Sequence, residues 1–210
     1  MERKEVSKSV LKRLPGYLAY LKSIPDGASP YISATALANA LGMGEVQVRK
    51  DLAMVSDGGR PKIGYQRENL IEDIEQFLGY DNTTDAVLIG AGKLGQALLG
   101  YHGFDEYGLN ILAAFDTAPA VEQTEEGKPI YSMDKLEGFC RLHKVRMGII
   151  TVPAQYAQTV CDQLINCGIK AIWSFASAHL EVPSNIPVQY ENMATSLAVL
   201  SMHLRAKDKK

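Results

Sequence analysis

The chain has 210 residues, of which 46% are hydrophobic, and its 22 Lys+Arg nearly balance its 24 Asp+Glu. This composition is ordinary for a globular protein and excludes a disordered chain, a collagen and a disulfide scaffold. The sequence shows neither the apolar stretch of a signal peptide nor a window that spans a membrane, so we expect a cytoplasmic protein with no membrane partner. Cys140, Cys161 and Cys167 form no CxxC pair, and we expect core thiols rather than a redox or metal site.

Charge is distributed unevenly along the chain. Residues 1–67 carry 11 Lys+Arg and 6 Asp+Glu, whereas residues 68–210 carry 11 and 18. A basic front joined to an acidic body is typical of a separate nucleic-acid-binding module. Chance variation of charge explains the asymmetry equally well, so charge alone leaves both interpretations open.

The basic front has the periodicity of a small helical domain. Leucines recur at helical spacing over residues 10–22, although Pro15 and Gly16 interrupt this segment and predict an irregular start. Ser33 is suited to cap a helix that ends near residue 40, and a tight turn then leads to a second helix over residues 45–55. In this second helix the expected inward residues are Val48, Leu52 and Val55, and the expected outward residues are Gln47, Arg49, Lys50 and Asp51.

Two helices joined by a glycine-containing turn form the helix-turn-helix arrangement, whose second helix enters the major groove. Any pair of amphipathic helices in a bundle gives a similar pattern, so DNA binding and simple packing both remain open here. The segment 56–65 then places Arg60 and Lys62 between glycines, and Pro61 biases Arg60 toward an extended backbone. Such a basic tip suits a wing that lays Arg60 in a narrow minor groove, although a solvated surface turn has the same composition.

The clearest motif of the chain follows a connecting helix expected over residues 68–77 and a domain boundary over 79–84. A short apolar strand, residues 86–89, runs directly into the G-x-G-x-x-G sequence of residues 90–95, which opens an amphipathic helix. The first glycine permits a tight turn, the second lets the backbone approach a pyrophosphate, and the third allows close packing of helix and strand. The predicted phosphate-binding residues are Gly90, Ala91, Gly92, Lys93, Leu94 and Gly95.

A second apolar strand, residues 110–115, ends at Asp116, which lies 21 residues past Gly95. An acidic side chain at this place hydrogen-bonds the adenosine ribose in dinucleotide-binding folds. Because no arginine follows Asp116 closely, NAD is favoured over NADP. The alternative is a nucleotide-free fold in which Asp116 merely ends a strand.

The remaining sequence continues the alternation of strands and helices. The expected strands are 128–131, 147–152 and 171–175, and the expected helices are 133–144 and a segment through Leu164 and Ile165. This order predicts an α/β, doubly wound, parallel sheet with right-handed crossovers. Because ligands bind at the carboxyl ends of such strands, Thr151, Val152, Pro153, Ser174 and Phe175 are secondary cofactor candidates. Thr151 and Ser174 are equally suited to capping roles.

Several of these motifs occur in one collinear order. They are Val48-Arg49-Lys50-Asp51, Arg60 with Gly64-Tyr65, residues 90–95, Ala114-Phe115-Asp116, Thr151-Val152-Pro153-Ala154 and Gly168-Ile169-Lys170. Together they resemble the Rex family of bacterial redox-sensing transcriptional repressors. The resemblance implies a homodimer with a winged-helix DNA-binding domain (1–79), a Rossmann NAD(H)-binding domain (80–190) and a C-terminal helix (191–210) that is exchanged between subunits. It also implies that the dimer binds an operator, expected to be palindromic, with NAD+ or without cofactor, and releases it when NADH binds.

The resemblance also identifies contact residues. The expected DNA contacts are Ser33, Gln47, Arg49, Lys50, Arg60 and Lys62. Tyr101 is expected near the nicotinamide, with Met193 of the partner's helix packing over it. The chain departs from the family's usual Leu-Ser-Tyr-Phe-Gly and Arg-x-Gly-x-Gly-Tyr, because it has Leu52-Ala-Met-Val-Ser56 and Arg60-Pro-Lys-Ile-Gly-Tyr65. We therefore expect a different operator preference.

A charge pair that relatives use for switching is missing in this chain. In relatives, an arginine in the first helix and an aspartate opening the exchanged helix pair in one of the two states. A gapless alignment puts Ala19 and Asn192 at these positions. Either non-ionic contacts bias the two states, or the alignment slips and Arg13 or Glu191 takes over the role.

An NAD-dependent oxidoreductase with a basic N-terminal module is the main alternative, since it would carry the same nucleotide motif. It needs a proton-transfer residue beside the nicotinamide and a substrate pocket. The histidines are poorly placed for this role, and Tyr101 has no lysine four residues later. A CoA-binding Rossmann protein is a third alternative, which the basic N-terminus does not support. We therefore expect a repressor with neither catalytic residues nor a metal.

Overall fold

The computed structural model describes residues 7–207 and divides into two compact units, Met1–Asn82 and Thr83–Lys210. Residues 1–6 and 208–210, which belong to the two expected terminal segments, lie outside the described residues. Within residues 7–207, no helix has the length and apolar character needed to cross a membrane.

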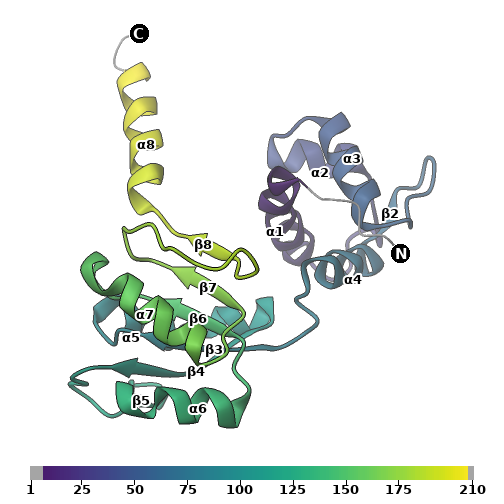
Figure 1. Ribbon diagram of the computed structural model, residues 1–210. Helices are drawn as coiled ribbons and strands as arrows, with labels where there is room; N and C mark the ends of the chain where they lie inside the picture. Colours follow the sequence, from purple (N-terminus) through teal and green to yellow (C-terminus); the bar gives the residue numbers. More distant parts are fainter. Residues whose placement is uncertain (1–6, 208–210) are drawn as a thin grey trace. The chain divides into compact units, whose positions relative to one another are not determined.

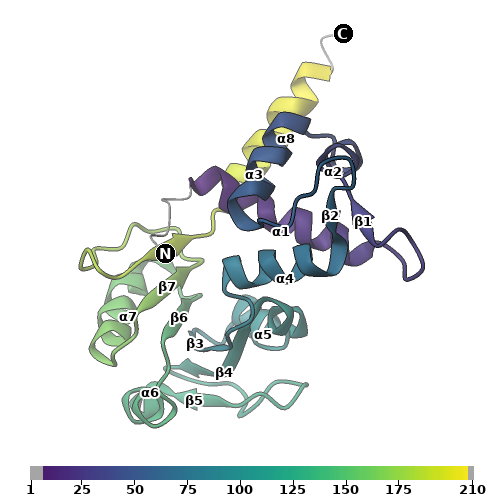
Figure 2. The same cartoon turned by 90° about the vertical axis from the view of Figure 1, so that its right-hand side faces the viewer.

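The first unit combines helices with a small antiparallel sheet (Figure 2). Its elements are α1 (Lys8–Ser23), β1 (Tyr31–Ile32), α2 (Ala34–Leu41), α3 (Glu45–Val55), β2 (Tyr65–Gln66) and α4 (Arg67–Leu78). The apolar faces of the helices enclose one core, which includes Leu14, Leu37, Leu52 and Leu70. The glycine-containing turn between α2 and α3 and the hairpin that follows α3 confirm the predicted winged-helix fold.

Helix α1 continues through Pro15 without a break, so the expected irregular start is wrong. Ser7 caps the helix, and its hydroxyl accepts a hydrogen bond from the Val10 amide at 3.4 Å. A proline inside a helix costs about 3 kcal/mol, whereas each large apolar side chain buried in a core contributes about 1.5–3 kcal/mol. The residues that α1 buries are Val10, Leu14, Tyr17, Leu18 and Leu21. Their packing outweighs the cost of Pro15.

The wing is a tight hairpin whose backbone needs a glycine. Arg60 and Gly64 form an antiparallel bridge, in which each amide donates to the other residue's carbonyl oxygen at 2.9 Å. Gly64 has a φ of 92°, and a Cβ at this residue would lie 2.3 Å from the carbonyl oxygen of Ile32. A side chain at residue 64 would therefore push the wing away from β1.

The second unit is a parallel sheet with helices on both faces (Figure 1). The strand order is β5-β4-β3-β6-β7-β8. The strands are β3 (Thr84–Ile89), β4 (Leu109–Asp116), β5 (Ile130–Ser132), β6 (Met147–Ile150), β7 (Ala171–Ser174) and β8 (Val188–Tyr190). The helices are α5 (Lys93–Leu99), α6 (Leu136–His143), α7 (Ala154–Asn166) and α8 (Met193–Lys207), with 3-10 turns at His102–Tyr107 and Met133–Lys135. The predicted doubly wound sheet is confirmed.

Alternate residues of the sheet supply the two cores of this unit. Val87 and Ile89 of β3 pack with residues of α6 and α7, whereas Ala86 and Leu88 pack with Leu99 of α5. This division follows from the two-residue period of a strand, which sends successive side chains to opposite faces. The sheet is thus buried on both faces, as its nearly continuous apolar strands predict.

The cysteines behave as core residues. Cys140 and Cys161 are buried and Cys167 is half-buried, and all three are free thiols. Burial raises the pKa of Cys140 to about 12 and that of Cys161 to about 11. Thiols with such values stay protonated near neutral pH, which makes them poor nucleophiles.

Helix α8 leads away from the sheet of its own unit (Figure 1). Its apolar side chains are largely exposed, since Met193 is 74%, Leu197 64%, Leu200 61% and Leu204 65% exposed. A helix with this much exposed apolar surface is typical of one that is buried against another molecule.

Candidate nucleotide and DNA sites

The glycine-rich turn joins β3 to α5 and depends on two glycines for its shape. Gly90 has a φ of 105°, a conformation that L side chains rarely adopt. A Cβ on Gly95 would lie 1.9 Å from the carbonyl oxygen of Gly90, so helix and turn touch at this residue. Gly92 caps α5 with an ordinary φ of −72°, and a Cβ on it would meet nothing within 4 Å. The space in front of Gly92 is open to a ligand.

Asp116 lies at the end of β4 and contacts this turn directly. Its carboxylate accepts hydrogen bonds from the amide of Ala91 at 2.7 Å and from the amide of Ala118 at 3.0 Å. The side chain therefore fixes the turn between β3 and α5 as well as lining the space beside it. An acidic residue at this position therefore has a structural use of its own.

A cleft of about 540 Å³ opens at the carboxyl ends of β3, β4 and β6. This is the edge at which doubly wound sheets bind ligands. Of the predicted cofactor contacts, the cleft is lined by Gly90, Gly92, Asp116, Thr151, Val152 and Pro153. The predicted contacts Ala91, Lys93, Leu94, Gly95 and Tyr101 are not among its lining residues. The cleft thus brings together the two glycines, the acid and the end of β6.

Sequence reasoning missed one wall of the cleft. Tyr156, Thr159, Val160 and Gln163 of α7 and Met133 line it together with the predicted residues. The α7 residues follow at helical spacing directly after Pro153, which was itself a candidate. Continuing the helical pattern for three turns past residue 153 would have identified this wall.

Thr151 also supports the turn structurally. Its hydroxyl oxygen lies 2.8 Å from the carbonyl oxygen of Gly90 and 3.0 Å from that of Ile89, and it donates to these acceptors. Ser174 is fully buried and accepts a hydrogen bond from the amide of Ala176 at 3.3 Å. Ser174 thus makes a local contact of the capping kind, whereas Thr151 joins the end of β6 to the turn after β3 and also lines the cleft.

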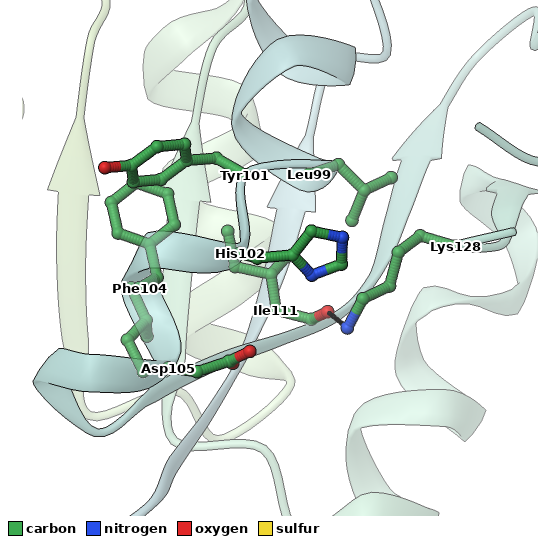
Figure 3. Close-up of a pocket in the computed structure, with 8 residues that line it drawn as sticks. Leu99, Tyr101, His102, Phe104, Asp105, Ile111 and Lys128 are labelled. Atoms are coloured by element: carbon green, nitrogen blue, oxygen red, sulfur yellow. Dashed lines mark hydrogen bonds between the residues drawn. The ribbon is translucent and has the colours of Figure 1, made fainter. Parts of the chain in front are cut away.

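Tyr101 follows α5 and is 57% exposed. Its ring packs edge-on against Phe104, with centroids 4.9 Å apart, and Phe104 packs in the same way against Trp173 of β7 at 5.6 Å. Tyr101, Phe104 and His102 also border a second, much smaller pocket (Figure 3). This pocket has a volume of about 10 Å³, and Lys128 closes it by donating to the carbonyl oxygen of Ile111 at 2.9 Å. It has room for about one water molecule and not for a substrate.

The aromatic row ends at the start of α8. The indole N–H of Trp173 donates to the carboxylate of Glu191 at 2.9 Å. The side-chain oxygen of Asn192 accepts from the amides of Ala194 and Thr195, so Asn192 caps α8. The residue expected at a switch position is therefore used to begin the helix.

In the first unit, the structure corrects one expectation about α3. Asp51 does not face outward, because it is only 3% exposed. Its carboxylate accepts hydrogen bonds from Nε and an Nη atom of Arg13, at 2.7 and 2.8 Å, and from the Tyr17 hydroxyl at 2.7 Å. Burial raises the pKa of Asp51, but these hydrogen bonds and the charge of Arg13 outweigh it and hold the pKa below its usual value. The pair fastens α3 to α1.

The remaining outward residues of α3 lie where the sequence predicts them. Gln47, Arg49 and Lys50 are exposed, and Arg49 pairs with Glu45 one turn earlier. Ser33 caps α2, since its hydroxyl accepts from the amide of Ala36 at 3.0 Å. The two wing cations, Arg60 and Lys62, are both exposed. Exposed cations thus lie on both the second helix of the motif and the wing.

The structure also bears on the switch pair that this chain is expected to lack. Arg13 is held by Asp51 within its own unit, and Glu191 is held by Trp173. Neither residue is free to replace the absent pair without breaking these contacts. Ala19 is exposed on α1 and carries no charge.

A winged-helix unit followed by a Rossmann unit with an open cleft is the architecture of a DNA-binding regulator that responds to a nucleotide ligand. Residues 5–53 match a family model described as a putative DNA-binding protein N-terminus, and residues 81–178 match one described as a CoA binding domain. The redox-sensing transcriptional repressor Rex of Treponema denticola is 40% identical over 94% of both chains. That of Porphyromonas gingivalis is 36% identical over 96% of this chain and 93% of its own.

Solved structures also match this chain over nearly its whole length. A crystal structure of RSP in complex with beta-NAD+ and operator DNA matches with a TM-score of 0.89 and 32% identity over 98% of this chain and 95% of that chain. The complex of RSP with beta-NADH matches with a TM-score of 0.84 and 31% identity over 98% and 97%. The chain belongs to the Rex family of redox-sensing transcriptional repressors.

Proposed function

We propose that this chain represses transcription by binding operator DNA and that NADH, bound in the cleft of the second unit, releases it. One observation carries this proposal. A chain of this family has both exposed cations on α3 and the wing and a nucleotide-sized cleft in its second unit. The proposed division is 1–79 for DNA binding, 80–190 for NAD(H) binding and 191–210 for exchange between two subunits. A repressor of this kind works in the cytoplasm, where the chromosome lies.

On the DNA side, we assign base contacts to Gln47, Arg49 and Lys50 and wing contacts to Arg60 and Lys62. Recognition helices of this motif lie in the major groove and read base edges with side chains of their exposed face. Glu45 restrains Arg49 on α3, whereas Lys50 makes no ion pair within residues 7–207. Lys50 is therefore the freer cation for a guanine edge. We assign the backbone of Ser33 to a DNA phosphate. Its hydroxyl is already used, because it caps α2.

Lys50→Ala and Arg60→Ala should weaken DNA binding in different ways. The test duplex is one that the purified chain enriches from a random pool. Loss of a base contact at Lys50 should cost about 1–3 kcal/mol and relax the sequence preference. Loss of Arg60, whose charge lies in the minor groove between the two phosphate backbones, should mainly lower the salt slope, by about one. Fluorescence anisotropy at several salt concentrations measures both. Lys12→Ala, an exposed lysine of α1, is the control. Parent-like binding by both variants would refute the docking.

On the nucleotide side, we assign the phosphates to residues 90–95 and the adenosine ribose to Asp116. Thr151, Val152 and Pro153 line the cleft on the other side of the turn from Asp116, at the end of β6. The backbone amides at the start of α5 supply donors for the pyrophosphate, which needs no positive side chain. Tyr101 is assigned to the nicotinamide end of the ligand.

Asp116→Ala should weaken NADH binding about tenfold and reduce the preference for NADH over NADPH. The carboxylate accepts the ribose hydroxyls and repels a 2′-phosphate. Calorimetric titration with each nucleotide measures both effects. Asp116→Asn removes the charge and keeps one acceptor for the amide of Ala91, while the contact with the amide of Ala118 is lost. Asp105→Ala, an exposed acid outside the cleft, is the control. If Asp116→Ala binds NADH with unchanged affinity, Asp116 does not contact the ligand.

The match to a CoA binding domain indicates CoA as a competing ligand for the cleft. CoA carries a 3′-phosphate on its adenosine ribose, and the carboxylate of Asp116 would repel it. We therefore expect no binding of CoA in the same titration. If the chain binds CoA more tightly than NADH, CoA and not NADH is the ligand of the cleft.

The exposed face of α8 supports a homodimer. Its apolar residues, among them Leu197, Leu200 and Leu204, are more than half exposed in the single chain. Exchange of this helix between two copies would bury them and bring Met193 to the partner's ligand. Because the charged switch pair is absent, we assign the bias between the two states to such non-ionic contacts with Tyr101.

A further inference from the structure

The centre of the exposed face of α3 is not fully polar. Val46, Lys50 and Met54 follow one another at four-residue intervals, and Val46 is 64% and Met54 39% exposed. The inward residues Val48 and Leu52 are fully buried on the opposite face. Residues four apart on a helix are neighbours on its surface, so one lysine lies between two apolar side chains.

Packing within the first unit does not explain these apolar side chains. The unit already buries Val48, Asp51 and Leu52 of α3 against the other helices. Exposed apolar residues grouped on one face often mark a binding site. The neighbouring exposed cations, Arg49 and Lys50, select a polyanion as the partner of this face.

The major groove of DNA offers one apolar group, the C5-methyl of thymine. We propose that Val46 and Met54 read thymine methyl groups on the two sides of a G·C pair that Lys50 binds. This inference rests on the proposed binding of operator DNA and names the bases within it. The rise of a helix places each apolar residue about 6 Å from Lys50 along the axis of α3, so the three side chains span about 12 Å of one recognition helix. The two methyl groups therefore belong to the same half-site.

Replacing thymine by deoxyuridine tests this proposal, because it removes only the methyl group. The probe is the duplex that the purified full chain enriches from a random pool, resynthesised with one uracil at a time. Burying a methyl group changes affinity about fourfold. We expect such a loss at one thymine of each half-site for Val46 and at a second thymine of each half-site for Met54, and little change at the remaining thymines. The measurement is the dissociation constant by fluorescence anisotropy.

Val46→Ala and Met54→Ala connect each methyl group to its reader. In Val46→Ala, the uracil that weakened the parent should have no further effect, while the uracil opposite Met54 should still weaken binding. Met54→Ala should show the reverse pattern, so the two double-mutant cycles check each other. Leu11→Ala removes an exposed apolar residue of α1 that is 42% exposed and should leave every uracil effect unchanged.

The outcomes separate this proposal from the one on which it rests. If no duplex is enriched, the proposed DNA binding itself fails. If the chain binds the duplex equally well with thymine and uracil at every position, DNA binding stands and the methyl contacts are refuted. A uracil effect that persists unchanged in both variants would assign the methyl groups to other residues and refute the roles of Val46 and Met54. In that last case, the exposed apolar residues Val46 and Met54 would be assigned to contact with another protein.

Discussion

Gly92→Val should abolish NADH binding while the protein keeps its fold. Gly92 has an ordinary backbone conformation, and a Cβ on it meets no atom of the chain within 4 Å. It nevertheless lines the cleft at the start of α5, where a pyrophosphate must approach the backbone. A branched side chain fills this space and excludes the phosphates. We expect a loss of affinity of about a hundredfold or more by calorimetry, with a melting temperature that falls only slightly, because valine is a poorer N-cap residue than glycine.

Gly95→Ala is the matched comparison for this prediction. Its Cβ would lie 1.9 Å from the carbonyl oxygen of Gly90, so α5 would have to move away from the turn. This variant should therefore lose stability as well as NADH binding. The pair distinguishes a glycine required by the ligand from one required by the fold. A Gly92→Val protein that binds NADH like the parent would show that the ligand does not approach this turn.

Arg13→Ala should strongly loosen α3 within the first unit. It leaves the carboxylate of Asp51 buried with only the hydroxyl of Tyr17 as a side-chain partner. Breaking a buried ion pair in this way costs about 3–5 kcal/mol. Hydrogen exchange of the α3 amides in the full chain measures the loss. Lys22→Ala breaks an exposed pair with Glu75 and should cost about 0–1 kcal/mol.

The pH dependence gives this prediction a second readout. In the parent, the pKa of Asp51 is lowered in the folded state, so its contribution is present above the unfolded pKa and is lost as the pH falls through the folded pKa. Without Arg13, burial dominates and raises the pKa of Asp51, which makes protonation favour the folded variant. The gap in stability between parent and variant should therefore begin to narrow as the pH falls through the raised pKa of the variant, and should narrow further below the unfolded value of about 4. A gap that is small, or that does not change with pH, would refute the role of the pair.

Local signals predicted much of the fold and of the nucleotide site. The turn at residues 90–95 and the acid at Asp116 were predictable because their chemistry depends on short, fixed spacings. The alternation of apolar strands and helices predicted the sheet, since a strand buried on both faces is apolar throughout. Strand β8 was missed because it has three residues at the edge of the sheet and no distinctive pattern.

The errors concern residues whose role depends on distant parts of the chain. Asp51 looks like a surface residue on an amphipathic helix, and only its contact with Arg13, 38 positions earlier, places it inside. The break expected at Pro15 ignored the packing of the rest of α1. The contact of Glu191 with Trp173 likewise joins two strand ends that the sequence separates by 18 residues. Such contacts are set by tertiary packing and leave no local pattern.

The most direct test of the account is whether NADH controls DNA binding. The enriched duplex is held at a fixed concentration with the full chain, and its anisotropy is followed as NADH, NAD+ or CoA is added. We expect NADH to weaken binding between about 5- and 150-fold, which is the usual range of coupling between two sites, and NAD+ to leave the complex intact. By the same coupling, the duplex should weaken NADH binding by the same factor. If calorimetry shows that NADH is bound and the duplex nevertheless stays bound with unchanged affinity, this chain does not sense NADH.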